Sequence, residues 1–68
     1  MKIKIVIPPH EDQLPDPLRD LGILPGDIIG DAQAVPETKH DAVRFQVWST
    51  EHERFVPCTV MGKNYKKL

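Results

Sequence analysis

The chain has 68 residues, a net charge of −1 and a single cysteine. One domain over residues 1–68 is predicted, with a thin core, because a fold of this size buries only about 60% of the surface that its unfolded chain exposes. One cysteine excludes an internal disulfide and any two-cysteine zinc knuckle or ribbon. No apolar run is long enough for a membrane span or a signal peptide, so the sequence predicts a cytoplasmic protein.

Charge is distributed unevenly along the chain. Residues 10–41 carry a net charge of −6, whereas residues 42–68 carry +3 and Lys2 and Lys4 add +2. This balance argues against a generic nucleic-acid coat. It indicates either a solvated acidic surface with basic ends or a dipolar surface that steers a partner.

The first third of the chain predicts a strand, a loop and a turn of helix. Isoleucines alternate with Lys2, Lys4 and Val6 over residues 2–7, which is the pattern of a strand with one buried face. Pro8-Pro9 ends that strand, and a loop follows to Pro15. Asp16 is expected to cap a helical turn over about 17–21, with Gly22 as its left-handed stop.

Residues 25–41 predict a turn, a distorted strand and a loop. Pro25-Gly26 has the chemistry of a type II turn. A strand over about 27–35 is expected to contain a bulge or sharp bend near Gly30, since glycine weakens a strand interior. Residues 36–41 have the composition of a loop.

The best-defined element is a hairpin over residues 42–61. Residues 42–49 and 54–61 pair across a four-residue loop, which sets Ser49 opposite Arg54 and fixes every later pair. One face is then wholly apolar, with the pairs Val47–Val56, Phe45–Cys58 and Val43–Val60. The other face has the pairs Trp48–Phe55, Gln46–Pro57, Arg44–Thr59 and Ala42–Met61. Pro57 predicts that its strand is an edge of the sheet at that point, or that its backbone faces away from a neighbouring strand. After Gly62, Tyr65 is expected to pack back on the sheet.

The aromatic pair Trp48–Phe55 is the candidate partner-binding site, together with Arg44 and Arg54. Aromatic and arginine side chains supply most hot spots of protein interfaces. The alternative is that the N-terminal strand or the C-terminal tail covers the two rings as a second small core. In the first case the protein is a non-catalytic protein-binding module, a small regulator that binds its partner stoichiometrically.

A single-stranded nucleic-acid module is the alternative function. Exposed aromatic rings stack bases, and lysines beside them contact phosphate, so Trp48 and Phe55 would act with Lys63, Lys66 and Lys67. The net charge and the acidic middle of the chain argue against it.

The remaining reactive residues do not form a catalytic pattern. His10, His40 and His52 are each followed by an acid, but adjacent residues of an extended chain point apart and chelate a metal poorly. Cys58 faces the apolar side of the hairpin, which disfavours a thiolate nucleophile. We therefore predict no enzyme activity, no metal site and no cofactor.

The segment Leu18-Arg19-Asp20-Leu21-Gly22-Ile23-Leu24-Pro25-Gly26-Asp27 resembles the helix-to-barrel entry of small β-barrels of the Src-homology-3 type. The ferrous-iron transport accessory (FeoA) family has a similar leucine, leucine-glycine, proline-glycine pattern. The layout of the chain also resembles many small phage or prophage proteins, which often bind and modulate a host or phage protein. The resemblances imply a β-barrel fold and a binding function.

The predicted fold class is mainly β. We expect a small, partly open β-barrel or a bent antiparallel sheet of four or five strands, with one short helical turn. A sheet this short leaves edges open, so a homodimer is a further expectation.

Overall fold

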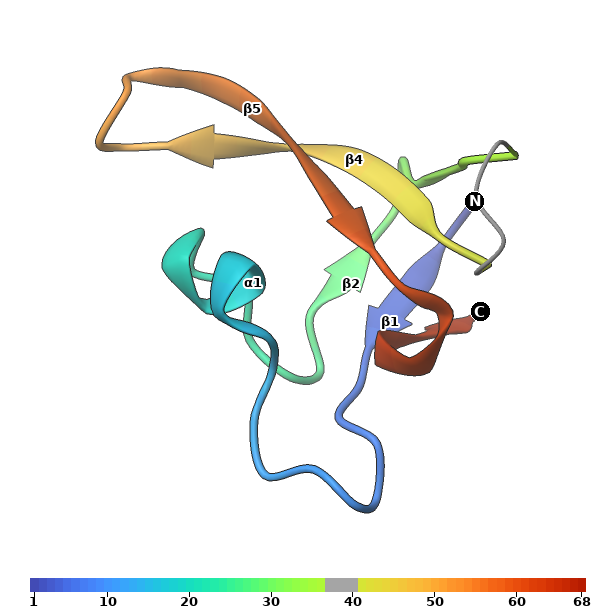
Figure 1. The fold of residues 1–68 in the computed structure, drawn as a ribbon. Helices are drawn as coiled ribbons and strands as arrows, with labels where there is room; N and C mark the ends of the chain where they lie inside the picture. The colour runs from blue at the N-terminus through green and yellow to red at the C-terminus, as the bar shows by residue number, and fades with distance from the viewer. Residues whose placement is uncertain (37–40) are drawn as a thin grey trace.

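The computed structural model describes residues 1–36 and 41–68 (Figure 1). Within these residues the chain forms six strands, one short helix and one 3-10 turn. Their order is β1 (Ile3–Ile5), α1 (Asp16–Asp20), β2 (Ile28–Ile29), β3 (Gln33–Ala34), β4 (Val43–Ser49), β5 (Arg54–Val60), η1 (Gly62–Asn64) and β6 (Tyr65–Lys67). The protein is therefore mainly β, as the sequence predicts.

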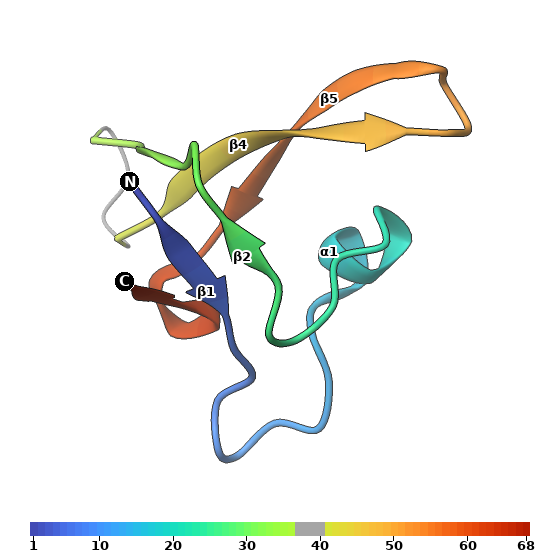
Figure 2. The ribbon, with the colours of Figure 1, turned by 180° about the vertical axis from the view of Figure 1, so that it is seen from behind.

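The six strands form two three-stranded antiparallel sheets rather than one sheet of four or five strands. The terminal sheet has the order β2-β1-β6 and the hairpin sheet has the order β3-β4-β5. These strands do not close into a barrel. Figures 1 and 2 show the long β4–β5 hairpin reaching outward over α1, while β1 and β2 lie beneath its other end.

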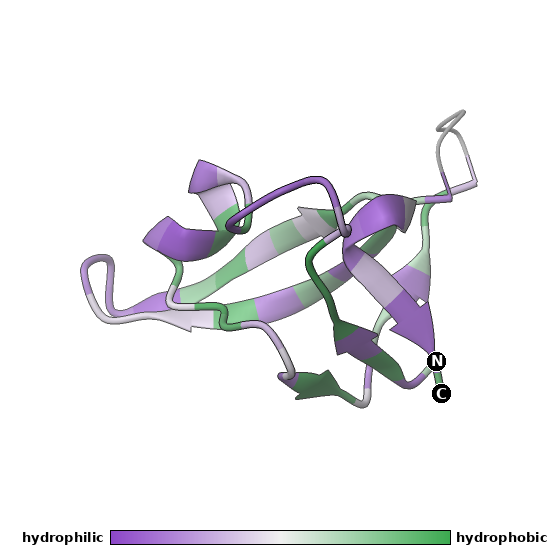
Figure 3. Ribbon diagram, turned by 90° about the horizontal axis from the view of Figure 1, so that it is seen from below, coloured by the Kyte–Doolittle hydropathy of each residue, from purple (hydrophilic) through white to green (hydrophobic). Residues whose placement is uncertain are grey.

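The hairpin has the register that alternation predicts. Seven of the eight predicted pairs, from Val43–Val60 to Ser49–Arg54, are present, and β5 is an edge strand, as Pro57 favours. The eighth, Ala42–Met61, is not part of the ladder, and Ala42 is buried instead of lying on the outer face. Val43, Phe45, Cys58 and Val60 are buried, whereas the alternate residues point outward. The colours of Figure 3 alternate along both strands accordingly.

One core joins the two sheets and the helix. Its members are buried apolar side chains from β1, α1, β4, β5, β6 and the connecting segments: Ile3, Ile5, Leu14, Leu18, Ile23, Ala32, Val43, Phe45, Cys58, Val60 and Tyr65. In β1 the exposed Lys4 lies between Ile3 and Ile5, which have no measurable exposure, and this confirms the predicted one-sided first strand.

The helical turn is present but is not capped as predicted. Its N-cap is Pro15, which makes no side-chain cap, and the carboxylate of Asp16 instead pairs with Arg19 in the first turn. Asp16 already lies inside the helix, because the carbonyl of Pro15 accepts the first helical N–H groups. Gly22 has φ +79° and ends the helix as expected.

The segment 27–35 is divided between the two sheets. Gly26 has φ +93° in the turn, where the N–H of Asp27 donates to Leu24 O at 3.1 Å. The chain pairs with β1 as β2, bends at Gly30 and Asp31, and pairs with β4 as β3. The bend predicted near Gly30 is thus the crossing from the terminal sheet to the hairpin sheet.

The C-terminal residues add a strand that the sequence did not predict. β6 pairs with β1 along Ile3–Lys67, Lys4–Lys66 and Ile5–Tyr65. Tyr65 packs against the core, as predicted, and its hydroxyl donates to the carbonyl of Asp41 at 2.5 Å. The two termini therefore lie on the same side of the molecule (Figure 2).

Asn64 fixes the start of β6. It has no measurable exposure. Its side-chain Nδ2 donates to Val6 O at 3.2 Å, and its backbone carbonyl accepts from Val6 N at 2.9 Å. Its Oδ1 has no hydrogen-bond partner among the described residues. The amide orientation follows from the acceptor it faces, since only the NH₂ group can satisfy the carbonyl of Val6.

We expect Asn64→Asp to destabilise the protein by about 1–3 kcal/mol at pH 7, because a buried carboxylate replaces the amide that donates to Val6 O. Burial raises the pKa of the new carboxyl above its unfolded value of about 4, so the loss is greatest at neutral pH and diminishes as pH falls towards 4. Urea unfolding at pH 4.5 and 7 measures it. Gln46→Glu, the same change at an exposed position, is the control. Equal effects of the two substitutions would contradict the burial of Asn64.

Candidate functional site

The outer face of the hairpin sheet, which points away from the core, holds the candidate site. Cross-strand pairing arranges it in rows: Trp48–Phe55 beside the loop, then Gln46–Pro57, then Gln33–Arg44–Thr59. We call this surface the aromatic face. All of its residues are exposed.

Trp48 and Phe55 contact each other but are not covered by the rest of the described chain. Their ring centroids lie 5.2 Å apart at an interplanar angle of 77°, an edge-to-face contact. Trp48 is 52% exposed and Phe55 is 63% exposed. The N-terminal strand and the C-terminal residues pair with each other in the terminal sheet. The rings are therefore a surface pair and not a second small core.

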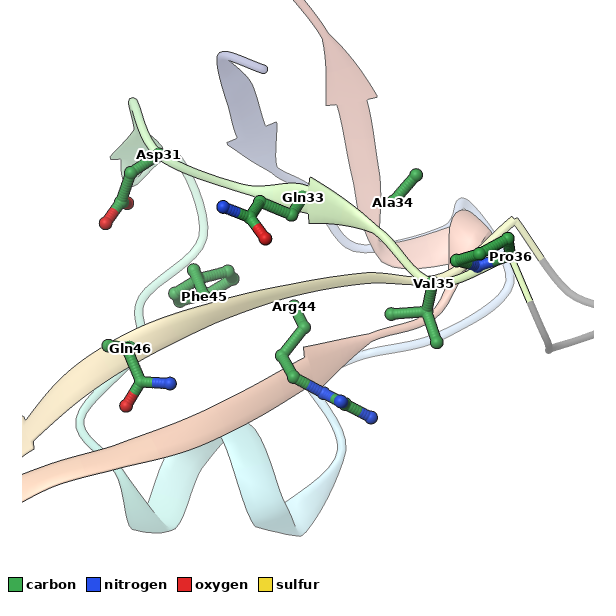
Figure 4. Close-up of a pocket in the computed structure, with 8 residues that line it drawn as sticks. All are labelled: Asp31, Gln33, Ala34, Val35, Pro36, Arg44, Phe45 and Gln46. Atoms are coloured by element: carbon green, nitrogen blue, oxygen red, sulfur yellow. The ribbon is translucent and has the colours of Figure 1, made fainter.

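Arg44 lies two rows from the rings on the same face. Its Nε donates to Thr59 Oγ1 at 3.3 Å. A hollow of about 260 Å³ lies beside β3 and β4, and the Arg44 side chain runs from it across β5 (Figure 4). Its lining residues are Asp31, Gln33, Ala34, Val35, Pro36, Arg44, Phe45 and Gln46. The lining of the hollow is therefore partly polar and partly apolar.

Arg54 does not belong to this face. It is paired with Ser49, and that row alternates with the Trp48–Phe55 row, so its side chain leaves the opposite side of the sheet. Of the four predicted partner-binding residues, the aromatic face therefore contains Trp48, Phe55 and Arg44, and the binding role of all four stays a prediction. The signal was available in the register, since residues adjacent in a strand point to opposite faces.

The predicted nucleic-acid lysines lie away from the rings. Lys63 is in η1 and forms an ion pair with Glu11 at 2.7 Å, and Lys66 and Lys67 are in the terminal sheet. The distance along β5 from Phe55 to Val60 alone is about 17 Å at 3.3–3.4 Å per residue. The rings and these lysines do not form one continuous track, and the nucleic-acid function stays a prediction.

The histidines and the cysteine do not add a reactive centre to this face. His10 and His52 are exposed, and His40 lies outside the described residues. In residues 1–36 and 41–68, His, Cys, Asp and Glu side chains do not gather in groups of three or more. Cys58 is buried opposite Phe45, and burial raises the pKa of its thiol.

No known protein family, curated protein or solved structure matches this chain. No helix in the described part of the chain is long and apolar enough to span a membrane.

The fluorescence of Trp48, the only tryptophan, reports directly on the site. We expect the native protein to emit close to the wavelength of free N-acetyltryptophanamide and to be quenched readily by acrylamide, because about half of the side chain is exposed. Unfolding in urea should shift the emission little. A blue-shifted native emission that moves to longer wavelength on unfolding would mean that the ring is covered.

Cys58 should react slowly with a thiol reagent such as 5,5′-dithiobis-(2-nitrobenzoate). Burial both blocks access and raises the thiol pKa, so the reactive thiolate is scarce in the native state. We expect labelling at pH 8 to be at least about 100-fold slower than in denaturant, because it requires an opening of the hairpin sheet. Similar rates in the two conditions would contradict the buried position.

Proposed function

We propose that this protein is a non-catalytic protein-binding module that acts through its aromatic face, as a small regulator binding a protein partner stoichiometrically. The observation that carries the proposal is the exposure of Trp48 and Phe55, which form a ring pair that the rest of the described chain leaves uncovered. Tryptophan is among the residues that contribute most to interface affinity.

The surroundings of the rings support a protein partner. Arg44 and the polar side chains of the hollow follow the rings along one face, so an apolar contact area is bordered by hydrogen-bonding groups. Interfaces between proteins have this arrangement, with an apolar centre and a polar rim.

The hairpin also presents the rings in a fixed geometry. Seven consecutive cross-strand pairs hold β4 and β5, and the inner side chains Phe45, Cys58, Val43 and Val60 anchor both strands in the core. A preorganised surface loses less conformational entropy on binding than a flexible one. The aromatic face is therefore suited to bind without rearrangement.

The double substitution Trp48→Ala and Phe55→Ala tests the proposal. We expect it to abolish capture of the partner from a lysate of the native host, identified by mass spectrometry, and to abolish 1:1 binding of that partner after purification. The variant should keep a cooperative thermal transition and lose only about 1 kcal/mol, the worth of an exposed cross-strand aromatic pair.

Leu24→Ala is the matched control, since Leu24 is 63% exposed like Phe55 but lies in the turn before β2. It should leave partner binding unchanged. Binding of the partner by the double variant with the same affinity as the wild type would contradict the proposal. If the captured protein were a second copy of this chain, the partner interaction would be homodimerisation. If no protein partner were captured, and the double variant lost a salt-sensitive binding to single-stranded DNA that the wild type shows, the nucleic-acid function would be favoured.

A further inference from the structure

The outer face of the terminal sheet carries three lysines in one group. Lys4 lies opposite Lys66, and Lys2 is two residues from Lys4 on the same side of the chain. The ladder continues past β1, where the N–H of Leu68 donates to Lys2 O at 2.9 Å. We call these three residues, with Ile28 and Leu68 beside them, the lysine face.

Aliphatic side chains border the lysines. Ile28 is opposite Lys4 on the other side of β1 and is 50% exposed, and Leu68 is 62% exposed. Figure 3 shows the corresponding strands side by side, with hydrophilic β6 and hydrophobic β2 flanking β1. The face is a row of positive charges with apolar side chains at both sides.

The arrangement is not explained by stability. Like charges directly opposite each other in a sheet are destabilising, and strands β1, β2 and β6 contain no acidic residue. The ion pairs within the described residues, Arg19 with Asp16 and Lys63 with Glu11, do not involve this face.

Protection of a sheet edge does not explain it either. Lysine on an edge strand hinders pairing with another chain, and that accounts for Lys66 on β6. Lys4, however, is in the central strand of the sheet, which has a partner strand on each side. The like-charged pair therefore points to a ligand that supplies negative charge.

We propose that the lysine face binds an acidic segment of a protein, with carboxylates placed on Lys2, Lys4 and Lys66 and aliphatic side chains placed on Ile28 and Leu68. Charge complementarity attracts the acidic segment to the lysines. Ile28 and Leu68 then contact its aliphatic side chains, which a small inorganic anion lacks. The site lies on the other sheet from the aromatic face and does not depend on the function proposed for it.

The composition of the face favours a protein over other anionic ligands. Single-stranded nucleic acid stacks its bases on aromatic rings, and a peripheral membrane helix inserts a broad apolar surface of Trp, Phe and Leu side chains, whereas this face offers only Ile28 and Leu68 beside its lysines. The lysine face has no exposed ring, because Tyr65, the aromatic residue of β6, is turned into the core.

Binding of a fluorescein-labelled peptide of alternating Glu and Leu, measured by anisotropy at low salt, tests the proposal. We expect saturable binding that weakens as salt is raised, and no binding of the peptide with Gln in place of Glu. Lys66→Glu should weaken binding at least about fivefold, because one attraction is replaced by a repulsion.

The same substitution should raise the melting temperature by about 2–6 °C, because the new carboxylate would pair with Lys4 across the strands. A gain in stability together with a loss of binding cannot come from misfolding. Lys67→Glu is the control, since it makes the same charge change on the same strand but on the other face. It should leave peptide binding within about twofold of the wild type, as expected for a screened charge outside the contact.

Four outcomes would overturn the proposal. The first is the absence of peptide binding at low salt, and the second is an equal loss of peptide affinity in Lys66→Glu and Lys67→Glu. The third is a melting temperature of Lys66→Glu below that of the wild type. The fourth is Lys66-dependent binding of labelled oligo-dT or of phosphatidylserine vesicles that is tighter than binding of the peptide. The double variant at Trp48 and Phe55 should bind the peptide normally, which separates this site from the aromatic face.

Discussion

The antiparallel ladder between β4 and β5 is the interaction on which the other features of the fold depend. Its register places Phe45 opposite Cys58 and Val43 opposite Val60, and these four side chains are the hairpin's contribution to the core. The same register forces the Trp48–Phe55 row to the outside. A slip by one residue would expose the apolar row, so burial of the inner face fixes the position of the rings.

The terminal sheet is held by contacts between distant parts of the chain. β1 is its central strand, and its partners are residues 28–29 and 65–67. Tyr65 and Asn64 lock the last strand in place through Asp41 O and Val6 O. Because the domain has so few core residues, each of these contacts contributes a large share of the free energy of unfolding.

The features predicted correctly from the sequence are those set by nearby residues. The four-residue loop and strict alternation determine the hairpin, and proline and glycine chemistry determines the turn at Pro25-Gly26 and the helix stop at Gly22. Pro57 favoured an edge position for its strand, and β5 is an edge of the hairpin sheet. The register also determines that Arg54, paired with Ser49, lies on the side of the sheet opposite to Trp48 and Phe55.

The features that were not predicted depend on contacts that composition and periodicity do not encode. β6 is three residues long and pairs with a strand about sixty positions earlier, and no local pattern marks such a partner. The lysine face was hidden for the same reason, since Lys4 and Lys66 become neighbours only through that pairing. Asp16 was expected as a cap because its type favours that position, but the helix began one residue earlier.

In the described part of the chain, two small sheets around one core leave each sheet with an outer face in contact with solvent, so about half of the strand residues are exposed. On both outer faces the side chains present are unfavourable for an isolated chain. Large aromatic rings remain exposed on the hairpin sheet, and like charges lie opposite each other on the terminal sheet. A thin core has little stability to offset such features, and each of them becomes favourable when a complementary surface covers it. The two faces lie on separate sheets, so their effects on binding should add independently.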